Sequence, residues 1–422
     1  MEEKVKVSVV VPVWNPGPGI VKCIARLRTQ TLREIEMIFV DDRGTDQAME
    51  HIREAAAEDA RIRILVNPEN RGPGYSRNAG MEAAEGMYVS FIDPDDYAAP
   101  DYLERLYSLA EKESLDIAKG RIVYEKEDGT AAEHEELNDV IRAGIKAGKP
   151  IYTVFSYEHH SAIYRRNMLQ RSGVRYGLAR RAQDTTFLLR ACHAAGSIGL
   201  DDQALYFFCE RAGSSMHVFD LASLDQRLFS FQEQVDYLST ALAGDAYAPA
   251  YTNALFLSNL RFFACYEPVP EHAQALERYC AGMRRQVLRL PFANVMKQRC
   301  YPVRALLEHG VLLPATPGYL PWEHAPAESW LELVRRWTEH LRAYPGGAAS
   351  AAAWFNQICE KAERAGTEDG CIENVRREIT AQRVRLPANV QAELRKASFF
   401  GKAARYFPKA LARLLHKLLK RS

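Results

Sequence analysis

Three carboxylates stand within four residues of Phe91-Ile92-Asp93-Pro94-Asp95-Asp96, here called the acid segment. The segment follows Met87-Tyr88-Val89-Ser90, an apolar-rich run with the length of a buried strand, so the carboxylates emerge where that strand ends. Carboxylates held so close repel one another. A divalent cation relieves the repulsion, because Mg2+ or Mn2+ takes oxygen ligands and can share them with a diphosphate. The alternative is an acidic turn before a helix, since Pro94 favours a turn and Pro100-Asp101 a helix start.

The residues before the acid segment predict the scaffold that positions it. Val7 to Val13 is an almost unbroken β-branched run, the pattern of a strand covered on both faces in a parallel sheet. Alternating strands and helices are typical of a doubly wound α/β fold with right-handed crossovers. The apolar periodicity predicts strands at 35–40, 62–66 and 87–92, and helices at 20–27, 48–57 and 72–84.

Polar side chains follow three of these strands. In a doubly wound sheet the ligand lies beyond the carboxyl ends of the strands, so we expect Trp14-Asn15, Asp41-Asp42 and the acid segment to converge on one crevice. The ring of Trp14 can stack on a base, Asp42 can accept from the N–H of uracil, and Arg77 can bind a phosphate or ribose hydroxyls. The ordinary alternatives are that Trp14 is an aromatic residue at the rim of the fold, that Asp42 belongs to a turn, and that Arg77 is a solvated helix residue.

Four motifs, taken in order, resemble those of family 2 glycosyltransferases. They are Val9-Val10-Val11-Pro12-Val13-Trp14-Asn15, Val40-Asp41-Asp42-Arg43-Gly44-Thr45-Asp46, Asn70-Arg71-Gly72 through Ala79-Gly80, and the acid segment. The resemblance covers about the first 220 residues and implies an α/β fold of the GT-A (Rossmann-like) type, a mostly parallel sheet flanked by helices. The second motif departs from the usual Asp-Asp-Gly-Ser-Thr at Arg43 and Gly44, which alters the turn more than the chemistry.

The resemblance also implies roles for individual residues. Asp93 and Asp95 match the DxD pair that binds the donor and its Mn2+ or Mg2+, with Asp95 favoured as the direct metal ligand. Arg77 would help to line the donor site. The nucleoside of the nucleotide-sugar donor would be held by Pro12, Trp14, Asn15 and Asp42.

Gln183-Asp184 stands where the family pattern has a Glu-Asp pair that opens a helix, and its Asp is the general base of inverting transferases. A carboxylate suits this task, because it must take the proton of the acceptor hydroxyl as the oxygen attacks the anomeric carbon. The alternative is that Asp184 N-caps a helix from Thr185 to Ala194, and both roles are compatible. Gln183 departs from the pattern and leaves the proposed base intact. Arg211, Ser214 and His217 follow as candidate donor contacts, with a surface loop as the alternative.

Composition limits the function classes. The chain has 422 residues, enough for two or three domains, and its net charge of +1 argues against a nucleic-acid partner. The 8 cysteines have no metal-ligand or redox spacing, so we expect reduced thiols and a cytoplasmic protein. The start Met1-Glu2-Glu3-Lys4 predicts no signal peptide, and no apolar run has the length of a transmembrane helix.

The predicted domains are 1–220, a GT-A glycosyltransferase domain, 221–395, a mainly helical C-terminal domain, and 396–422, a basic amphipathic tail. The tail has eight basic residues from Lys396 to Arg421 and no acid, beside an apolar stripe. This pattern favours peripheral binding to the inner face of an anionic cell membrane over a helix packed on its own protein. Glu133-His134-Glu135-Glu136 favours a solvated charge run over a metal site.

The sequence therefore predicts an inverting glycosyltransferase that moves a sugar, favoured as a UDP-sugar, to a hydroxyl of a glycan or lipid-linked acceptor in cell-surface polysaccharide synthesis. Leu333 stands where processive members have Gln before Arg336-Trp337, so we expect a non-processive enzyme. The second hypothesis is a catalytically silent nucleotide-sugar-binding scaffold subunit. A third, a nucleotidyltransferase, is disfavoured because Asn15-Pro16-Gly17-Pro18-Gly19 offers no cation to a triphosphate.

Overall fold

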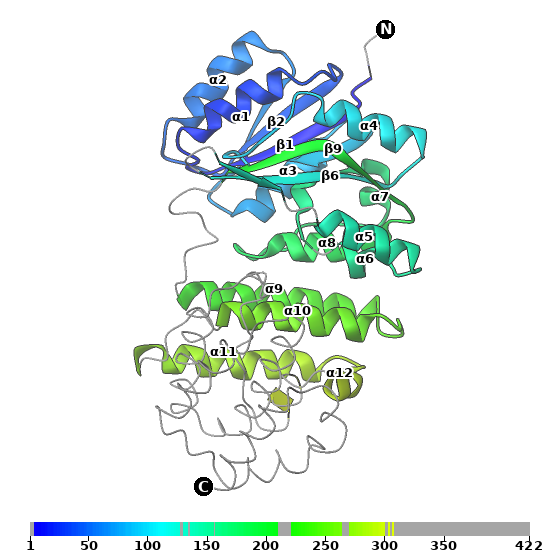
Figure 1. Cartoon of the computed structure of the whole chain (residues 1–422). Helices are drawn as coiled ribbons and strands as arrows, with labels where there is room; N and C mark the ends of the chain where they lie inside the picture. The colour runs from blue at the N-terminus through cyan, green and yellow to red at the C-terminus, as the bar shows by residue number, and fades with distance from the viewer. Residues whose placement is uncertain are drawn as a thin grey trace, which may run out of the picture. The chain divides into compact units, whose positions relative to one another are not determined.

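The computed structural model describes residues 4–126, 130–133, 136–155, 157–209, 221–263, 270–299, 303 and 306–307 (Figure 1). Its strands are β1 (Val7–Val13), β2 (Ile35–Asp41), β3 (Ile62–Val66), β4 (Tyr88–Phe91), β5 (Tyr97–Ala98), β6 (Ile117–Glu125), β7 (Ala131–Glu133), β8 (Ala162–Arg165) and β9 (Ile198–Cys209). The helices that pack on this sheet, with the 3-10 turn η1, are α1 (Gly19–Arg28), α2 (Ala48–Glu58), α3 (Pro73–Ala83), α4 (Tyr102–Lys112), α5 (Glu136–Lys146), α6 (Ile151–Val154), η1 (His159–Ser161), α7 (Arg166–Arg171) and α8 (Gln183–Ala194).

One sheet joins all of the strands, in the order β3-β2-β1-β4-β8-β6-β9-β5, with β7 paired to β6. The first four strands pair in parallel, and β6 is parallel to β9. The pairs of β8 with β4 and β6 are antiparallel, as are β5 with β9 and β7 with β6. The parallel half therefore brings the ends of β1, β2 and β4 to the same edge.

The apolar runs explain why β1 and β2 are central. Every residue of both strands is buried, as expected for strands covered on both faces. Pro12 is tolerated in β1 because the pairing with β4 ends at Val10, so the missing N–H of Pro12 leaves no gap in that ladder. On its other side β1 stays paired to β2 through Val13.

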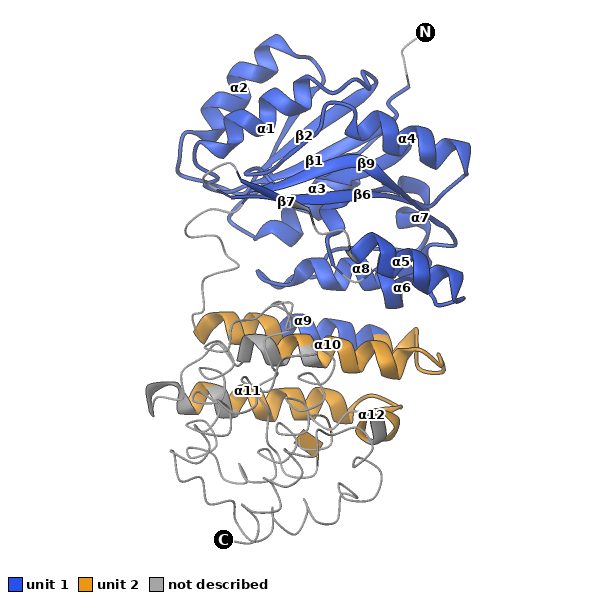
Figure 2. Ribbon diagram, viewed as in Figure 1, with its two compact units in different colours: residues 1–218, 229–237 blue, residues 219–228, 238–422 orange. Residues whose placement is uncertain are grey.

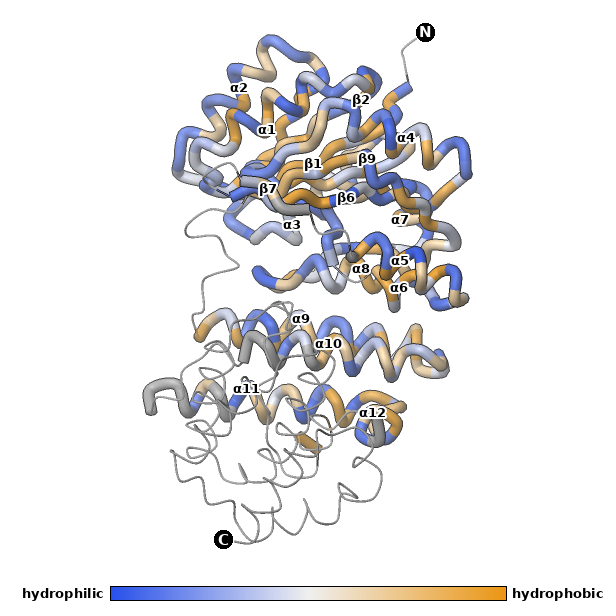
Figure 3. Tube along the Cα trace, viewed as in Figure 1, coloured by the Kyte–Doolittle hydropathy of each residue, from blue (hydrophilic) through white to orange (hydrophobic). Residues whose placement is uncertain are grey.

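Helices cover both faces of the sheet, and the core lies between the layers. The side chains of α1, α2 and α4 share one apolar cluster with alternate residues of β1 and β2. On the opposite face α3 packs against β1 and β2, where a Cβ at Gly80 would meet Val10 at 2.4 Å. Figure 3 shows the apolar residues concentrated along the strands and polar residues on the outer sides of the helices.

The chain divides into two compact units (Figure 2). Residues 1–218 and 229–237 form unit 1, and residues 219–228 and 238–422 form unit 2. Beyond the sheet the described helices are α9 (Leu221–Thr240), α10 (Ala248–Phe263), α11 (Pro270–Leu288) and α12 (Ala293–Arg299). The domain boundaries drawn from the sequence stay a prediction.

The predicted α/β fold class is confirmed: one sheet with a parallel half is flanked by helices, and further helices follow in the described C-terminal part. The stretch 125–150 contains β7 and α5, and α5 buries Leu137, Asn138 and Ile141. Among the described cysteines, Cys23, Cys192 and Cys209 are free thiols. Among the described helices, none combines the length and apolarity needed to cross a membrane. Several predictions concern residues outside the described part of the chain. They are the tail at 396–422, residues 308–395 of the predicted helical domain, and His134, Arg211, Ser214 and His217.

Candidate active site

The three carboxylates of the acid segment have different partners. Asp96 is 2% exposed and accepts hydrogen bonds from the Tyr206 hydroxyl at 2.8 Å and the Cys209 amide at 2.9 Å. Burial raises the pKa of Asp96 well above its ordinary range, and the charges of Asp93 and Asp95 raise it further. Asp96 therefore ties the acid segment to β9, while Asp93 and Asp95 remain partly exposed at the end of β4.

Asp93 pairs with a buried arginine. Oδ1 of Asp93 lies 2.5 Å from Nη2 of Arg77, and the Arg77 side chain is 5% exposed. Two other nitrogens of Arg77, Nε and Nη1, are buried without a hydrogen-bond partner in the described residues. Burial would lower the pKa of Arg77, but the charge of Asp93 opposes this and raises it, so the guanidinium stays charged. Arg77 also lies 5.4 Å from the centroid of the Tyr176 ring.

Asp95 lies against the first turn of α1. A Cβ at Gly19 would stand 3.1 Å from Cα of Asp95, so glycine permits this close approach of the helix N-terminus to the acid segment. The positive end of the helix dipole favours negative charge at that position. Asp95, like Asp93, keeps part of its surface exposed. The two aspartates predicted from the DxD pattern are thus brought together at one strand end.

Asp42 organises the loop that follows β3. Its carboxylate is buried and accepts hydrogen bonds from the Asn67 side chain at 2.7 Å and from the amides of Arg71 at 2.8 Å and Gly72 at 2.7 Å. Asn67 also donates to Ser76 Oγ at 2.9 Å, which connects Asp42 to α3. Both carboxylate oxygens of Asp42 thus accept hydrogen bonds from the protein itself, and direct contact of Asp42 with a base stays a prediction.

The ends of β1 and β2 are joined through Asn15. Its Oδ1 accepts from the amides of Thr45 at 2.6 Å and Asp46 at 3.2 Å, and its own φ is 47°. Trp14 beside it is 57% exposed, as a ring available for stacking requires. Pro12 is buried inside β1. Exposure thus agrees with a ligand contact at Trp14, while the roles of all three residues in nucleoside binding stay predictions.

Asp184 lies in the first turn of α8 and does not cap that helix. The N-cap is Ala182, which has a φ of 58° and makes no side-chain cap bond, so the capping alternative for Asp184 is wrong. The Asp184 side chain is 31% exposed. Burial of the rest raises its pKa, while the nearby charge of Arg77 works in the opposite direction. A carboxylate with a raised pKa is suited to accept a proton.

The loop before Asp184 is held by residues of α9 that belong to unit 1. Ser230 Oγ donates to the carbonyl of Ala182 at 2.7 Å, and the Leu178 amide donates to Glu233 Oε1 at 2.9 Å. Gln234 reaches Thr185 Oγ1 at 3.2 Å. Residues 230–234 of α9 therefore help to shape this site, and sequence periodicity alone offers no signal of that contact.

A buried aromatic cluster lies beneath Asp184, and sequence analysis did not identify it. Tyr176 and Phe187 stack with centroids 4.2 Å apart, and Phe91 meets both rings edge-on at 5.0 and 5.3 Å. His159 packs into the same cluster, 5.5 Å from Tyr176. Adjacent histidines directly before a strand were the available signal for this position.

Comparison with known proteins decides the family. The sequence profile described as Glycosyl transferase family 2 matches residues 8–173. The uncharacterized glycosyltransferase EpsJ of Bacillus subtilis is 31% identical over 234 residues, 53% of this chain and 66% of that protein. Residues 8–173 of the chain belong to glycosyltransferase family 2.

Two further comparisons agree with this family 2 assignment. The succinoglycan biosynthesis protein ExoO of Rhizobium meliloti is 29% identical over 227 residues, 52% of this chain and 65% of that protein. The alignments with EpsJ and ExoO thus span slightly less than two thirds of each relative. The crystal structure of S. aureus TarS 1-349 in complex with UDP-GlcNAc superposes with a TM-score of 0.50 at 21% identity, covering 72% of this chain and 92% of that one. This likeness shows the shared fold.

The family 2 domain brings most of the predicted site residues to the carboxyl ends of β1, β2 and β4. Arg77 links the acid segment to Asp184, because it forms an ion pair with Asp93 and its charge acts to lower the pKa of Asp184. The alternative of a solvated Arg77 is wrong, since its side chain is 5% exposed. Metal binding at Asp93 and Asp95 and the catalytic role of Asp184 stay predictions.

Proposed function

We propose that this chain is an inverting, non-processive glycosyltransferase that moves a sugar from a nucleotide diphosphate sugar, favoured as a UDP-sugar, to a hydroxyl of a glycan or lipid-linked acceptor. The observation that carries the proposal is the position of Arg77. It forms an ion pair with Asp93 of the acid segment and lies close enough to Asp184 to affect its pKa. A donor-binding carboxylate and a base therefore share one cation at one edge of the sheet.

On the donor side, Trp14 would stack on the base and Asn15 would hold the loop beside it. The buried Arg77 has two nitrogens without partners among the described residues, and an anionic diphosphate would satisfy them. TarS, which shares the fold, was crystallised with UDP-GlcNAc, and this supports a UDP-sugar as donor.

The residues present fit a divalent cation. Burial and the charges of Asp93 and Asp95 raise the pKa of Asp96, and the carboxylate oxygens of Asp93 and Asp95 suit Mg2+ or Mn2+. Among the described residues no group of three or more His, Cys, Asp or Glu side chains is placed to hold a metal alone, so diphosphate oxygens would complete the ligand set. Asp95 and Asp93 would hold the cation, which when bound stabilises negative charge on the departing diphosphate.

The chemical step belongs to Asp184. Its carboxylate takes the proton of the acceptor hydroxyl while that oxygen attacks the anomeric carbon from the side opposite the diphosphate. A new C–O bond forms, the bond to the diphosphate oxygen breaks, and the nucleoside diphosphate leaves with the bonding electrons. Attack from the opposite side inverts the configuration at that carbon. Partial burial serves Asp184 because it raises its affinity for the proton.

The experiment is a screen of nucleotide sugars for metal-dependent release of nucleotide, followed by an acceptor screen with the donor found. Asp95→Ala should abolish metal-dependent release. Asp184→Asn should keep donor binding and lower transfer by roughly 10²- to 10⁴-fold, the usual contribution of a general base. Asp139→Asn is the matched control, because the Asp139 side chain is 73% exposed and pairs with Arg142 of the same helix.

The outcomes separate the alternatives. Donor binding without turnover, at the same affinity in wild type and Asp184→Asn, would favour the silent scaffold subunit. An absence of binding to every nucleotide sugar would overturn the proposal. Retention of configuration at the anomeric carbon in the product would contradict the role of Asp184 while leaving donor binding intact.

The relatives and the tail support the proposals for the acceptor and for the cellular site of the enzyme. ExoO is named for succinoglycan biosynthesis, which supports a polysaccharide acceptor. The basic residues at 396–422 support peripheral binding of a cytoplasmic enzyme to the inner face of the membrane, where a lipid-linked acceptor would be found. Flotation of the full chain with anionic vesicles, and its loss in a Lys417→Glu/Lys420→Glu variant, would support this. Equal flotation with neutral vesicles would contradict it.

A further inference from the structure

The turn Glu158-His159-His160-Ser161 carries a buried imidazole that the proposed reaction does not use. His159 is 4% exposed, and neither of its ring nitrogens has a hydrogen-bond partner among the described residues. The rings of Phe91, Tyr176 and Phe187 surround it. A phenylalanine ring would pack there without burying two unpaired polar atoms. Packing alone therefore does not explain a histidine at this position.

One of these nitrogens lies toward the proposed base. Nδ1 of His159 is 3.9 Å from Oδ2 of Asp184, longer than a hydrogen bond. A displacement of about 1 Å in the carboxylate would bring the two atoms to hydrogen-bond distance. The carboxylate has freedom to move because its side chain is 31% exposed. Catalytic hydrogen bonds are often long before substrate binds and shorten in the complex.

The imidazole, unlike the carboxylate, is held firmly. The preceding Glu158 has a φ of 68° and is fixed by an ion pair with the buried Lys119 at 3.1 Å. The Glu158 carbonyl accepts from the Ser161 amide at 3.1 Å and from its hydroxyl at 2.9 Å. The carbonyl of His159 accepts from the Tyr164 hydroxyl at 2.7 Å. The turn thus presents the ring from a rigid backbone.

We propose that His159 is a positioning residue for Asp184: as a neutral imidazole protonated on Nδ1, it donates a hydrogen bond to one carboxylate oxygen and leaves the other for the acceptor proton. The inference rests on the proposed function, since it takes Asp184 to be the base. Burial lowers the pKa of His159 well below its ordinary value, and the charge of Arg77 lowers it further, so the ring stays neutral. A neutral ring can orient the carboxylate without forming a competing ion pair.

The groups that face Asp184 come from several elements. Arg77 on α3 and Asp93 after β4 act on its pKa in opposite directions. Tyr164 on β8 and Tyr176 before α8 are both influenced by the charge of Asp184, and burial raises the pKa of each hydroxyl well above its ordinary value, so they stay protonated. These four groups remain in place in a His159 variant. A change in the titration of Asp184 there reports the loss of the imidazole.

The test compares His159→Phe, which keeps the ring and removes its nitrogens, with His159→Asn, which keeps an N–H donor. His160→Phe is the matched control, because His160 is the adjacent residue and its ring nitrogens are likewise buried and without partners in the described residues. His159→Phe should lower kcat/KM for transfer about tenfold and move the acid limb of its pH profile up by about one unit, as expected for losing a hydrogen bond to a charged group. His159→Asn should recover part of both effects, and His160→Phe should show neither.

A double variant tests whether His159 acts through Asp184. In an Asp184→Asn background, His159→Phe should have no further effect on transfer, because the group that it positions is gone. An equal loss in both backgrounds would overturn the proposal, as would an unchanged pH profile in His159→Phe. Donor affinity should be the same in all variants, and a matching melting temperature excludes misfolding as the cause.

A second readout needs no activity. With 13C-labelled aspartate, the carboxyl resonance of Asp184, assigned by its absence in Asp184→Asn, gives its pKa directly. His159→Phe should raise this pKa, whereas His160→Phe should not, since removing a donor to the carboxylate destabilises the charged form. If wild type binds no donor, the proposed function fails and this titration still decides the inference. An unchanged pKa in His159→Phe overturns it.

Discussion

Unit 1 buries charged groups in two regions, around Lys119 and around Arg77. The regions differ in whether the hydrogen-bonding atoms of the buried groups have partners. Around Lys119 each donor is used: its Nζ donates to the Gly120 carbonyl, Asn138 and Glu158 at 3.0, 3.2 and 3.1 Å. At the site the buried Arg77 leaves Nε and Nη1 without a partner in the described residues, and His159 leaves both ring nitrogens. Both regions bury cations beside carboxylates, so burial alone does not separate structure from function.

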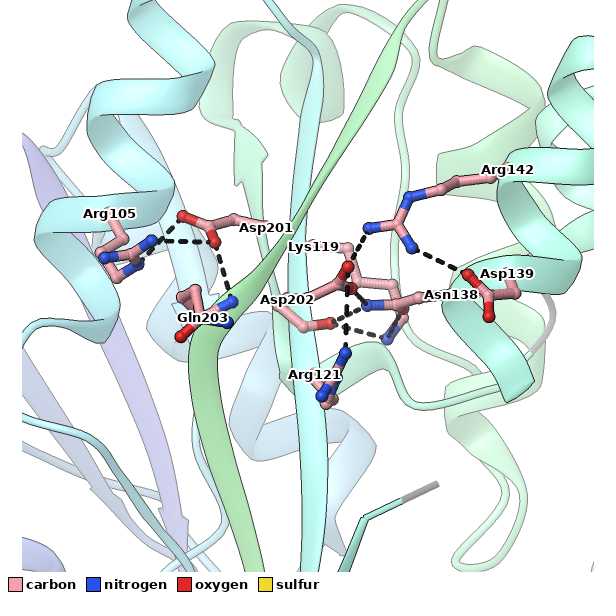
Figure 4. A network of polar contacts seen from close by, with 10 residues as sticks. Arg105, Lys119, Arg121, Asn138, Asp139, Arg142, Asp201, Asp202 and Gln203 are labelled. Carbon is pink, nitrogen blue, oxygen red and sulfur yellow. Dashed lines mark hydrogen bonds and ion pairs between the residues drawn. The ribbon is translucent and has the colours of Figure 1, made fainter. Parts of the chain in front are cut away.

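Figure 4 shows how the Lys119 network continues. Asn138 on α5 donates to the Gly120 carbonyl at 3.3 Å and to Asp202 on β9 at 2.8 Å. Arg142, one turn further along α5, pairs with the other oxygen of Asp202. The network thus joins β6, α5, β9 and the turn that carries His159. Complete pairing predicts a structural role, and unused donors at the site predict a ligand.

The largest effect is expected from Lys119→Met. The substitution leaves the buried Glu158 without its cation, and breaking a buried pair in this way costs about 3–5 kcal/mol of unfolding free energy. Lys119→Met/Glu158→Gln removes both charges and should recover part of this loss. Calorimetric melting of the purified variants measures it. Arg142→Met is the control, because the Arg142 side chain is 41% exposed and its pair should contribute about 1 kcal/mol or less. A Lys119→Met protein as stable as wild type would remove the distinction between the two regions.

Arg77→Met should show the opposite pattern. Stability should change by about 1 kcal/mol or less, because two Arg77 nitrogens lose no partner and Asp93, 25% exposed, can be rehydrated. Donor turnover should fall roughly 10²- to 10³-fold, the usual cost of losing a donor aimed at developing charge. Steady-state kinetics and melting of the same sample measure both. Arg77→Lys should restore part of the activity only, since it lacks the planar fork. A stability loss equal to that of Lys119→Met would contradict the comparison.

The unpartnered histidines should make the site region sensitive to acid. Burial lowers the pKa of His160 to about 4, below its ordinary value, and the charge of Asp93 only partly opposes this. The unfolded chain then binds a proton that the folded chain does not, so stability is lost as the pH falls below about 6.5 toward 4, by about 1.4 kcal/mol per pH unit at most.

The matched comparison for this pH effect is wild type against His160→Phe. Two carboxylates, the buried Asp96 and the partly exposed Asp184, have raised pKa values and contribute with the opposite sign, and they are present in both proteins. The difference between the two unfolding curves between pH 4.5 and 6.5 therefore isolates the histidine. Parallel curves would show that His160 is paired in solution.

The parallel half of the sheet could be predicted from the sequence because its signal is local. Continuous β-branched runs such as Val7–Val13 mark strands buried on both faces, and the acid segment marks the end of one of them. The antiparallel insertion of β8 between β4 and β6 depends on pairing across about seventy residues, and no local pattern encodes that register. The residues that were predicted are therefore those at strand ends.

The same limit explains what was missed at the site. Asp184 could be found from a motif, but its partner His159 comes from a turn 25 positions earlier, and only the packing of β8 and α8 brings them within 3.9 Å. The helix contacts of Ser230 and Glu233 with the Asp184 loop are equally non-local. Arg77 was predicted as a ligand contact, but its burial could not be foreseen from a helix of mostly small and polar residues.

The smallest expected effect concerns the turn after β2, where this chain departs from the family pattern. Arg43 has a φ of 63° and an exposed side chain, and the amides of Arg43 and Gly44 donate to Asp41 Oδ1 at 2.9 and 3.3 Å. A left-handed conformation strains any residue that has a Cβ, and Arg43→Gly relieves this strain. Glycine also adds entropy to the unfolded chain, which offsets part of the gain. The unfolding free energy should therefore rise by a net amount of about 0.5–1 kcal/mol.

Asn15→Gly is the contrast, because Asn15 has a similar φ of 47° but its side chain accepts two backbone hydrogen bonds. Relief of strain there should be outweighed by the loss of those bonds, and melting should show a lower stability than wild type. If Arg43→Gly stabilises the chain and leaves donor turnover unchanged, the arginine is a tolerated departure in the turn. If turnover falls while stability rises, the strain at this position is retained because the arginine contributes to the site. Arg43 would then be a second cation, besides Arg77, that acts on the donor.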